Sequence, residues 1–130
     1  MREIKFRGKR LDNGEWVYGF VFFNQYKSEA VIARVADTES VCENVDPVTV
    51  GQFTGLHDKN GKEIYEGDII IEKLRRARKD GERLVVCFDD FEWQGKNANG
   101  ATTSLSLLVE YHTIEVIGNI HDNPELLKTE

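Results

Sequence analysis

Hydrophobic and polar residues alternate over several short segments of this chain, which is the pattern of β-strands that bury one face. Ile4 and Phe6 alternate with charged residues near the start. In residues 15–23, EWVYGFVFF, aromatic side chains occupy every second position: Trp16, Tyr18, Phe20 and Phe22. They would share one face of a long strand. Residues 12–14, Asp-Asn-Gly, are a turn signal between the two segments, so we expect an N-terminal hairpin.

A third strand is expected at residues 30–36, AVIARVA. Residues 37–47 are acidic and lack apolar periodicity, so we interpret them as a connection between an N-terminal β region, residues 1–46, and a second region, residues 47–130. In the second region, further strands are expected at residues 48–53, 64–65, 67–74, 83–93, 104–112 and 114–120. Strands this short and this closely spaced favour a small barrel.

The C-terminal end has the signals of a short helix. Asn123 offers a capping side chain, Pro124 stands where the backbone amide would be unpaired anyway, and Glu125 adds an acid to the first turn. The predicted fold is therefore mainly β. It consists of an N-terminal antiparallel hairpin or small sheet, packed on a C-terminal small barrel that ends in a short helix.

Residues 54–70, TGLHDKNGKEIYEGDII, suggest three different structures. A calcium-binding EF-hand loop would begin at Asp58, but its sixth and twelfth positions would hold Glu63 and Ile69 instead of glycine and glutamate. A phosphate-binding loop would use residues 55–62, but five residues separate its two glycines where four are needed, and Glu63 replaces the magnesium-binding serine or threonine. Neither ligand site is expected here.

The third structure is a turn between paired strands. Asn60-Gly61 is the dipeptide best suited to positive φ at both central positions of a tight turn. The side chain of Asp58 can accept hydrogen bonds from the backbone just beyond it, and Gly67-Asp68 forms a second reversal. We therefore predict that this segment is scaffold.

Several motifs in this order are shared with one protein family. They are Arg2 to Arg7, Thr54-Gly55-Leu56, Asp58, Asn60-Gly61, Ile64-Tyr65, Gly67-Asp68-Ile69, Ile117 to Ile120 and Asn123 to Leu127. The chain thus resembles the YopX family of phage and prophage proteins along nearly its whole length. The resemblance implies a small, mainly β protein encoded by a phage or prophage, with a C-terminal part similar to an SH3-type barrel. It implies no activity and assigns no catalytic or ligand residue.

The chain has a net charge of −6, yet eleven of its 17 basic residues lie in two short segments. The first is residues 2–10, and the second contains Lys73, Arg75, Arg76, Arg78, Lys79 and Arg83. The acidic total disfavours indiscriminate binding to DNA, because the attraction to phosphate is a sum over all charges. Residues 79–81, Lys-Asp-Gly, predict that the second segment is a basic hairpin tip.

This basic tip supports two interpretations. It can bind nucleic-acid phosphate, with Phe88, Phe91 and Trp93 stacking on bases if they are exposed. Alternatively, it is a solubilising loop that pairs with the acidic residues 37–47. The candidate binding residues are therefore the six basic residues of the tip together with Trp93.

Residues that carry catalytic or metal chemistry are sparse. His57, His112 and His121 form no HxxxH or HxH pair, and the two cysteines lack metal-finger spacing. Cys42 and Cys87 are expected to be reduced thiols, because no export signal is recognisable. We predict no catalytic residue, no metal ligand and no cofactor. A metal-assisted hydrolase that uses acids near residue 89 with a histidine is a third, weaker hypothesis.

The leading hypothesis is a noncatalytic binding module of a mobile element, which binds a protein partner or a second copy of itself. Nucleic-acid binding through Lys73 to Arg83 is the second hypothesis. No membrane partner is expected, since the longest apolar runs are far shorter than the ~20 residues that cross a bilayer. The expected location is the cytoplasm of a bacterial host.

Overall fold

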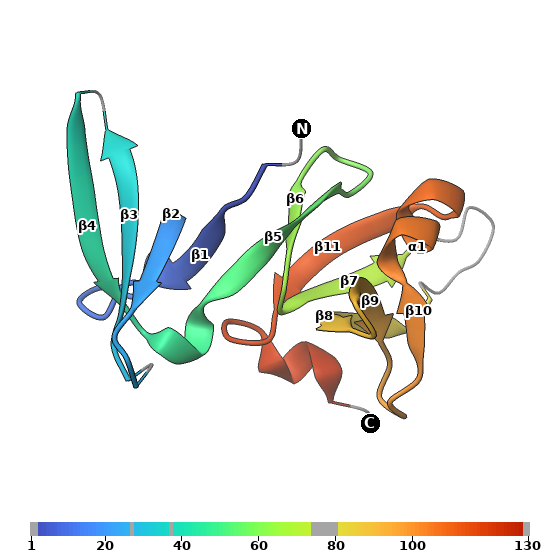
Figure 1. The fold of residues 1–130 in the computed structure, drawn as a ribbon. Coiled ribbons are helices and arrows are strands. Elements are labelled where there is room, and N and C mark those ends of the chain that lie inside the picture. The colour runs from blue at the N-terminus through green and yellow to red at the C-terminus, as the bar shows by residue number, and fades with distance from the viewer. Residues whose placement is uncertain (1–2, 27, 37, 74–80, 129–130) are drawn as a thin grey trace. The chain divides into compact units, whose positions relative to one another are not determined.

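The chain divides into two compact units, residues 1–53 and 54–130, and each is considered by itself (Figure 1). The structure is a computed structural model that describes residues 3–26, 28–36, 38–73 and 81–128. The division lies within a strand, β5, further along the chain than the boundary predicted between residues 46 and 47. The mainly β prediction is confirmed, because both units are built from antiparallel strands.

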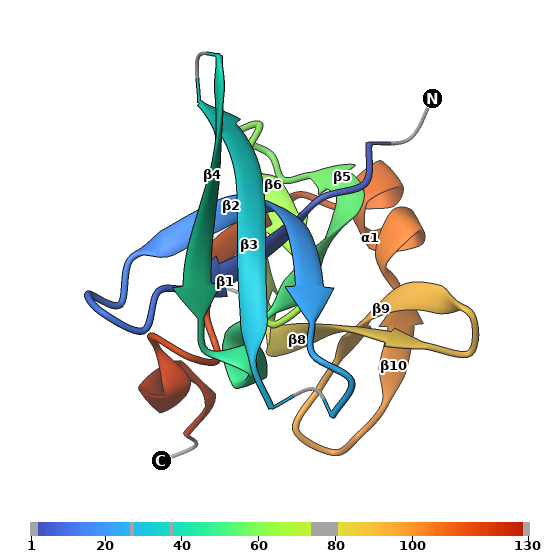
Figure 2. The same cartoon turned by 60° about the vertical axis from the view of Figure 1, so that its left-hand side comes forward.

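The first unit is an antiparallel sheet with the strand order β4-β3-β2-β1-β5. Its elements are β1 (Phe6–Lys9), β2 (Trp16–Phe23), β3 (Ala30–Ala36), β4 (Glu39–Val45), the 3₁₀ turn η1 (Pro47–Thr49) and the start of β5 (Gly51–His57). Figure 2 shows β3 between β4 and β2. The expected N-terminal hairpin, β1 with β2, and the expected third strand are both confirmed.

The sheet of the first unit closes on itself where the end of β1 meets the end of β4. Arg10 and Val45 form a bridge, the Asp46 amide donates to the Lys9 carbonyl at 2.8 Å, and the Leu11 amide donates to Asn44 at 3.1 Å. Closure encloses a small core of apolar side chains: Val17, Ala30, Ile32 and Val45. The opposite face of each strand therefore points outward.

The prediction that residues 37–47 form an irregular connection is wrong, because β4 occupies most of them. β4 pairs with β3 along its whole length. The acid of this strand, Glu43, lies beside two arginines, at 3.8 Å from Arg10, which follows β1, and at 3.1 Å from Arg34 on β3. These ion pairs compensate a charge that would disfavour a strand when the segment is read alone.

The second unit has a five-stranded antiparallel sheet with the order β10-β9-β8-β7-β11. Its elements are β6 (Glu63–Tyr65), β7 (Asp68–Glu72), β8 (Arg83–Asp89), β9 (Glu92–Lys96), β10 (Thr102–Ser104), α1 (Leu105–Tyr111), β11 (Ile114–Asn119) and the 3₁₀ turn η2 (Pro124–Leu127). β5 continues from the first unit and lies beside β6. One cluster forms the core: Ile64, Ile70, Leu84, Val86, Leu105, Leu108, Ile114 and Val116.

Three expectations for the second unit need correction. Residues 83–93 are two strands and not one, since the chain reverses between β8 and β9. Residues 104–112 are mostly the helix α1, because Leu105 and Leu108, three positions apart, both reach the core. At the C-terminus the expected helix is a single 3₁₀ turn, and Asn123 accepts a hydrogen bond from the Asn119 amide instead of capping that turn. No helix among the described residues is long and apolar enough to span a membrane.

Candidate binding surfaces

The segment 54–70 is a turn between strands, as predicted. Gly61 and Gly67 have φ values of +81° and +89°, which L side chains rarely adopt. The Asp58 carboxylate is buried, and its Oδ1 accepts the amides of Asn60 at 2.8 Å and Lys62 at 2.9 Å. Its Oδ2 accepts the amide of Val116 at 3.0 Å. The oxygens that a calcium site would need are therefore engaged by the protein's own backbone.

Burial by itself would raise the pKa of Asp58, because it disfavours the charged carboxylate. The hydrogen bonds from Val116, Lys62 and Asn60 outweigh burial, and the pKa of Asp58 is lowered from its ordinary value. Asp58 thus joins the β5–β6 turn to β11 as a charged hydrogen-bond acceptor.

A groove of about 850 Å³ lies on the second unit, on the face of the sheet that η2 partly covers. Aliphatic side chains line it: Ile71, Val85, Ala98, Ile117, Leu126 and Leu127. Charged and polar side chains line it as well: Lys73, Glu82, Arg83, Lys96, Asn97 and Lys128. Among the described residues of its lining, four cations and one acid give the groove a positive charge in a protein whose net charge is −6. We call this surface the basic groove.

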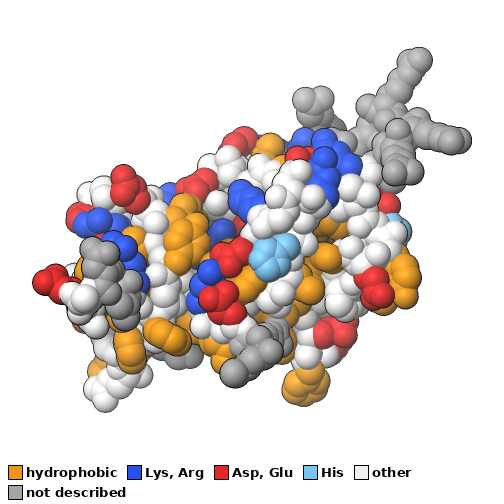
Figure 3. Space-filling view, turned by 90° about the horizontal axis from the view of Figure 1, so that it is seen from above, with side chains coloured by type: hydrophobic (Ala, Val, Ile, Leu, Met, Phe, Trp, Pro, Cys, Tyr) orange, Lys and Arg blue, Asp and Glu red, His pale blue; other side chains and the backbone are white. Residues whose placement is uncertain are grey.

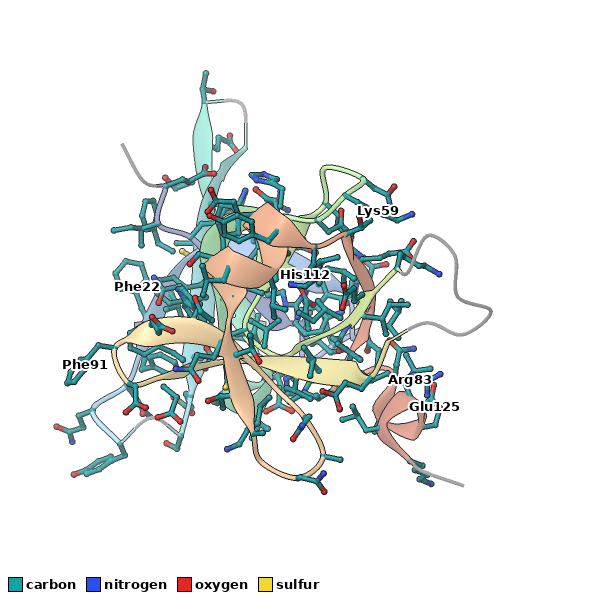
Figure 4. All side chains as sticks on the ribbon, turned by 90° about the vertical axis from the view of Figure 1, so that its right-hand side faces the viewer. Phe22, Lys59, Arg83, Phe91, His112 and Glu125 are labelled. Carbon is teal, nitrogen blue, oxygen red and sulfur yellow. The ribbon has the colours of Figure 1, made fainter. Side chains whose placement is uncertain are left out.

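Two of the cations of the basic groove are held in place by the fold. The Lys73 ammonium lies 3.3 Å from Glu115 Oε2, and Arg83 donates from Nη1 to the Leu126 carbonyl at 2.6 Å. Figure 4 shows Arg83 beside the turn that carries Glu125. Lys96 and Lys128 are exposed, and neither forms an ion pair with another residue in the described part of the chain.

The structure separates the predicted binding residues. Lys73 and Arg83 lie together in the basic groove. The remaining basic residues of the predicted tip, Arg75, Arg76, Arg78 and Lys79, fall outside the described residues. Trp93 lies elsewhere: it stands opposite Phe88 across the ladder and packs against the core, whereas Lys96, three positions along β9, points to the other face. Trp93 therefore does not belong to the basic groove.

The turn between β8 and β9 projects an aromatic side chain into solvent. Phe91 is 97% exposed, and Asp89, Asp90 and Glu92 around it are exposed too. Asp90 and Phe91 have φ values of +49° and +64°, the left-handed region that such turns usually fill with asparagine and glycine. We call residues 89–92 the acidic tip. Its sequence lacks glycine and asparagine, which is why the reversal was missed.

Replacing Phe91 by glycine is expected to stabilise the fold. Glycine adopts positive φ without the clash that a side chain causes, and the Phe91 ring has almost no contact to lose. The free energy of unfolding should rise by about 1 kcal/mol. Urea unfolding of the wild type and of Phe91→Gly measures this difference. A lower stability for Phe91→Gly would contradict the view that Phe91 is kept at a cost to the fold.

The first unit carries an aromatic surface on β2. Tyr18, Phe20 and Phe22 alternate along the strand, and Phe20 and Phe22 are 62% and 63% exposed. Ala33 and Val31 on β3 stand opposite Phe20 and Phe22 and point to the same side. These five residues define the aromatic surface. In the view of Figure 3, hydrophobic side chains reach the surface of the protein between charged ones.

The histidine side chains in the described part of the protein do not form a metal-binding site. His57 and His112 line a hollow of about 170 Å³ with Asp58, whose carboxylate is already bonded to the backbone. His112 Nδ1 lies 2.6 Å from Glu72 Oε1. Among residues 3–26, 28–36, 38–73 and 81–128, no three His, Cys, Asp or Glu side chains form a group that could bind a metal.

The two thiols, Cys42 and Cys87, are not joined in a disulfide. Burial raises the pKa of the Cys87 thiol, because the thiolate is disfavoured away from water. A raised pKa opposes nucleophilic reactivity at neutral pH. Cys87 is therefore better suited to a structural role on β8 than to the role of a nucleophile.

Comparison with known families decides the relationship suggested by the sequence motifs. The family described as YopX protein matches residues 5–128. The chain belongs to the YopX family.

Two crystal structures are similar to this protein over essentially the whole length of the chain. One is protein EF1440 from Enterococcus faecalis, which is 25% identical in sequence to this chain, with a TM-score of 0.64. The match covers 98% of this chain and 100% of the EF1440 chain.

The second structure, YopX from Bacillus subtilis, is 23% identical in sequence to this chain, with a TM-score of 0.63. The match covers 100% of this chain and 99% of the Bacillus subtilis chain. At that identity it supports the YopX fold and nothing further. A comparison with curated proteins found no match. The family assignment therefore establishes the relationship and the fold, and it assigns no activity to any residue.

Proposed function

We propose that this YopX-family protein is a noncatalytic module that binds a protein partner through the aromatic surface. The observation that carries the proposal is the exposure of Phe20 and Phe22 on the outside of a sheet that already encloses its own core. Burying one phenylalanine side chain stabilises by about 2 kcal/mol, so a row of exposed rings leaves much binding free energy unused. Aromatic residues are also enriched at protein interfaces.

A second feature of the aromatic surface favours a protein as the partner. The aromatic surface lies on a regular, paired sheet and includes the small and branched side chains of Ala33 and Val31 beside the rings. A continuous apolar patch of this kind is typical of protein-protein contact sites. The acids on the neighbouring positions of β4 are directed elsewhere: Glu43 stands opposite Ile32, which points into the core.

We also propose that the protein acts in a bacterial cytoplasm as a phage or prophage accessory protein. Support comes from the YopX family and from its structural relatives in Enterococcus faecalis and Bacillus subtilis, which are bacteria. The noncatalytic assignment is supported by the position of Asp89, Asp90 and Glu92, which lie exposed at a hairpin turn. General acid-base catalysis normally uses carboxyl groups that a partly buried site has tuned.

The double variant Phe20→Ser with Phe22→Ser tests this proposal. Affinity-tagged wild-type and variant proteins would be incubated with lysate of the bacterial host, and retained proteins would be quantified by mass spectrometry. The proteins retained by the wild type should bind the variant about 800-fold more weakly, since central aromatic residues of an interface each contribute about 2 kcal/mol and the double variant removes two of them.

Tyr26→Ser is the matched control, because Tyr26 is a 79% exposed aromatic residue of the same unit outside the aromatic surface. It should retain the same proteins as the wild type. Both variants should unfold at the wild-type urea concentration. If the double variant retains the same proteins in the same amounts, the aromatic surface is not the binding site.

A further inference from the structure

The acidic tip has a composition that the fold does not require. Phe91 is almost fully exposed, and its backbone adopts a conformation that glycine would adopt more easily. Three acids surround it: Asp89, Asp90 and Glu92. A strained turn that holds an apolar ring in water indicates a role in binding, because strain of this kind persists at functional sites.

The basic groove has the complementary character. Its floor is aliphatic, as a phenylalanine ring requires, and its cations include the exposed Lys96 and Lys128. The acidic tip would bring three negative charges to a groove lined by four positive charges and one negative charge. Complementarity of both charge and apolar surface is the basis of specific recognition between proteins.

One molecule cannot place its acidic tip in its own basic groove. The acidic tip and the basic groove lie at opposite ends of the same β8–β9 hairpin, because Asp89 pairs with Glu92 at one end while Val85 pairs with Lys96 toward the other. The length of β8 separates Arg83 from Asp89 by about 20 Å. Figure 4 shows Phe91 and Arg83 far apart on opposite sides of the view.

We propose that the acidic tip of one copy binds the basic groove of a second copy. Phe91 packs on the aliphatic floor, and the tip acids pair with the groove cations. The two surfaces differ, so the contact is head-to-tail and each bound copy still offers one tip and one groove. Such contacts generate closed rings or open chains. This inference involves only the second unit and goes beyond the binding proposed for the aromatic surface.

Nucleic acid is the competing occupant of the basic groove, and the lining disfavours it. Proteins that bind single strands stack bases on aromatic side chains. Among the described residues that line the groove there is no aromatic side chain, and Trp93 packs on the other face of the sheet. A floor of aliphatic side chains suits the ring of Phe91 better than a run of phosphates.

Complementation between two variants tests the head-to-tail contact. The tip variant, Phe91→Ser, keeps an intact groove, and the groove variant, Lys96→Glu with Lys128→Glu, keeps an intact tip. Each variant alone should be monomeric in sedimentation velocity. An equimolar mixture should form a dimer and nothing larger, because one functional tip then meets one functional groove.

Lys59→Glu is the matched control, since Lys59 is exposed and lies outside the groove. It should assemble like the wild type, as should Phe20→Ser with Phe22→Ser, so failure here is distinct from failure of the aromatic surface. A mixture that stays monomeric while the wild type assembles would overturn the proposal. A wild type that is always monomeric, and binds single-stranded DNA or RNA less well with the groove variant, would assign the groove to nucleic acid instead.

Discussion

Asp58→Ala should lower the free energy of unfolding by about 4 kcal/mol, because a buried carboxylate that accepts three backbone amides would be lost. The amide of Val116 lies in buried surroundings and would have no acceptor. The amides of Asn60 and Lys62 would be left to water at the turn. Urea unfolding followed by tryptophan fluorescence measures the loss.

Asp58→Asn separates the two parts of this effect. The remaining side-chain oxygen can still accept the amides of Asn60 and Lys62, but the side-chain amide cannot accept from Val116. The loss should therefore be roughly half of that for alanine. Equal losses for the two substitutions would mean that the bonds at the turn contribute nothing.

The same residue makes stability depend on pH. The pKa of Asp58 is lower in the folded protein than in the unfolded chain, where it is about 3.9. Its contribution is therefore complete above the unfolded-state value and is lost as the pH falls through the lower folded-state pKa. Between pH 7 and pH 2, Asp58→Asn should lose less stability than the wild type. An identical decrease in both proteins would refute the role assigned to the charge.

Gly19→Ala should lower the free energy of unfolding by about 3 kcal/mol or more. A Cβ atom on Gly19 would lie 2.2 Å from the Ala33 carbonyl oxygen, which is backbone and cannot move aside as a side chain could. Gly19 is also the position at which β2 stops pairing with β1 and begins to pair with β3. The closed sheet of the first unit thus depends on this close approach of two strands.

Gly61→Ala is the matched comparison for Gly19→Ala. Gly61 has a positive φ, but no atom lies within 4 Å of its added Cβ, so only backbone strain opposes the substitution. That strain should cost about 1 kcal/mol. Thermal unfolding of both variants measures the difference. A Gly19→Ala protein as stable as Gly61→Ala would show that the strands at Ala33 can separate without loss.

Elements whose signals are local in sequence were predicted well. The β1–β2 and β5–β6 turns have glycine where the backbone needs positive φ, at Gly14 and Gly61. The turn at Asp90-Phe91 has no such residue, so it was read as continuous strand. The helix α1 begins with alternating serine and leucine, a pattern of period two, and only the packing of its leucines on the core reveals the helix.

The binding surfaces depend on contacts between residues that are distant in sequence. Lys73 and Arg83 were identified because they belong to one basic segment. Lys96 and Lys128 were missed, since β9 and the C-terminal turn bring them to the groove from elsewhere in the chain. The separation of Trp93 from the groove has a similar origin, because the face of Trp93 is set by the register of β8 and β9.

The claim that copies of this YopX-family protein bind one another, acidic tip to basic groove, is tested most directly by the mass of the wild type in solution. Sedimentation equilibrium should be recorded from micromolar to millimolar concentration. We predict that the average mass rises above the 14.9 kDa of one chain as the concentration increases. A constant mass of 14.9 kDa over the whole range would contradict the head-to-tail contact between copies.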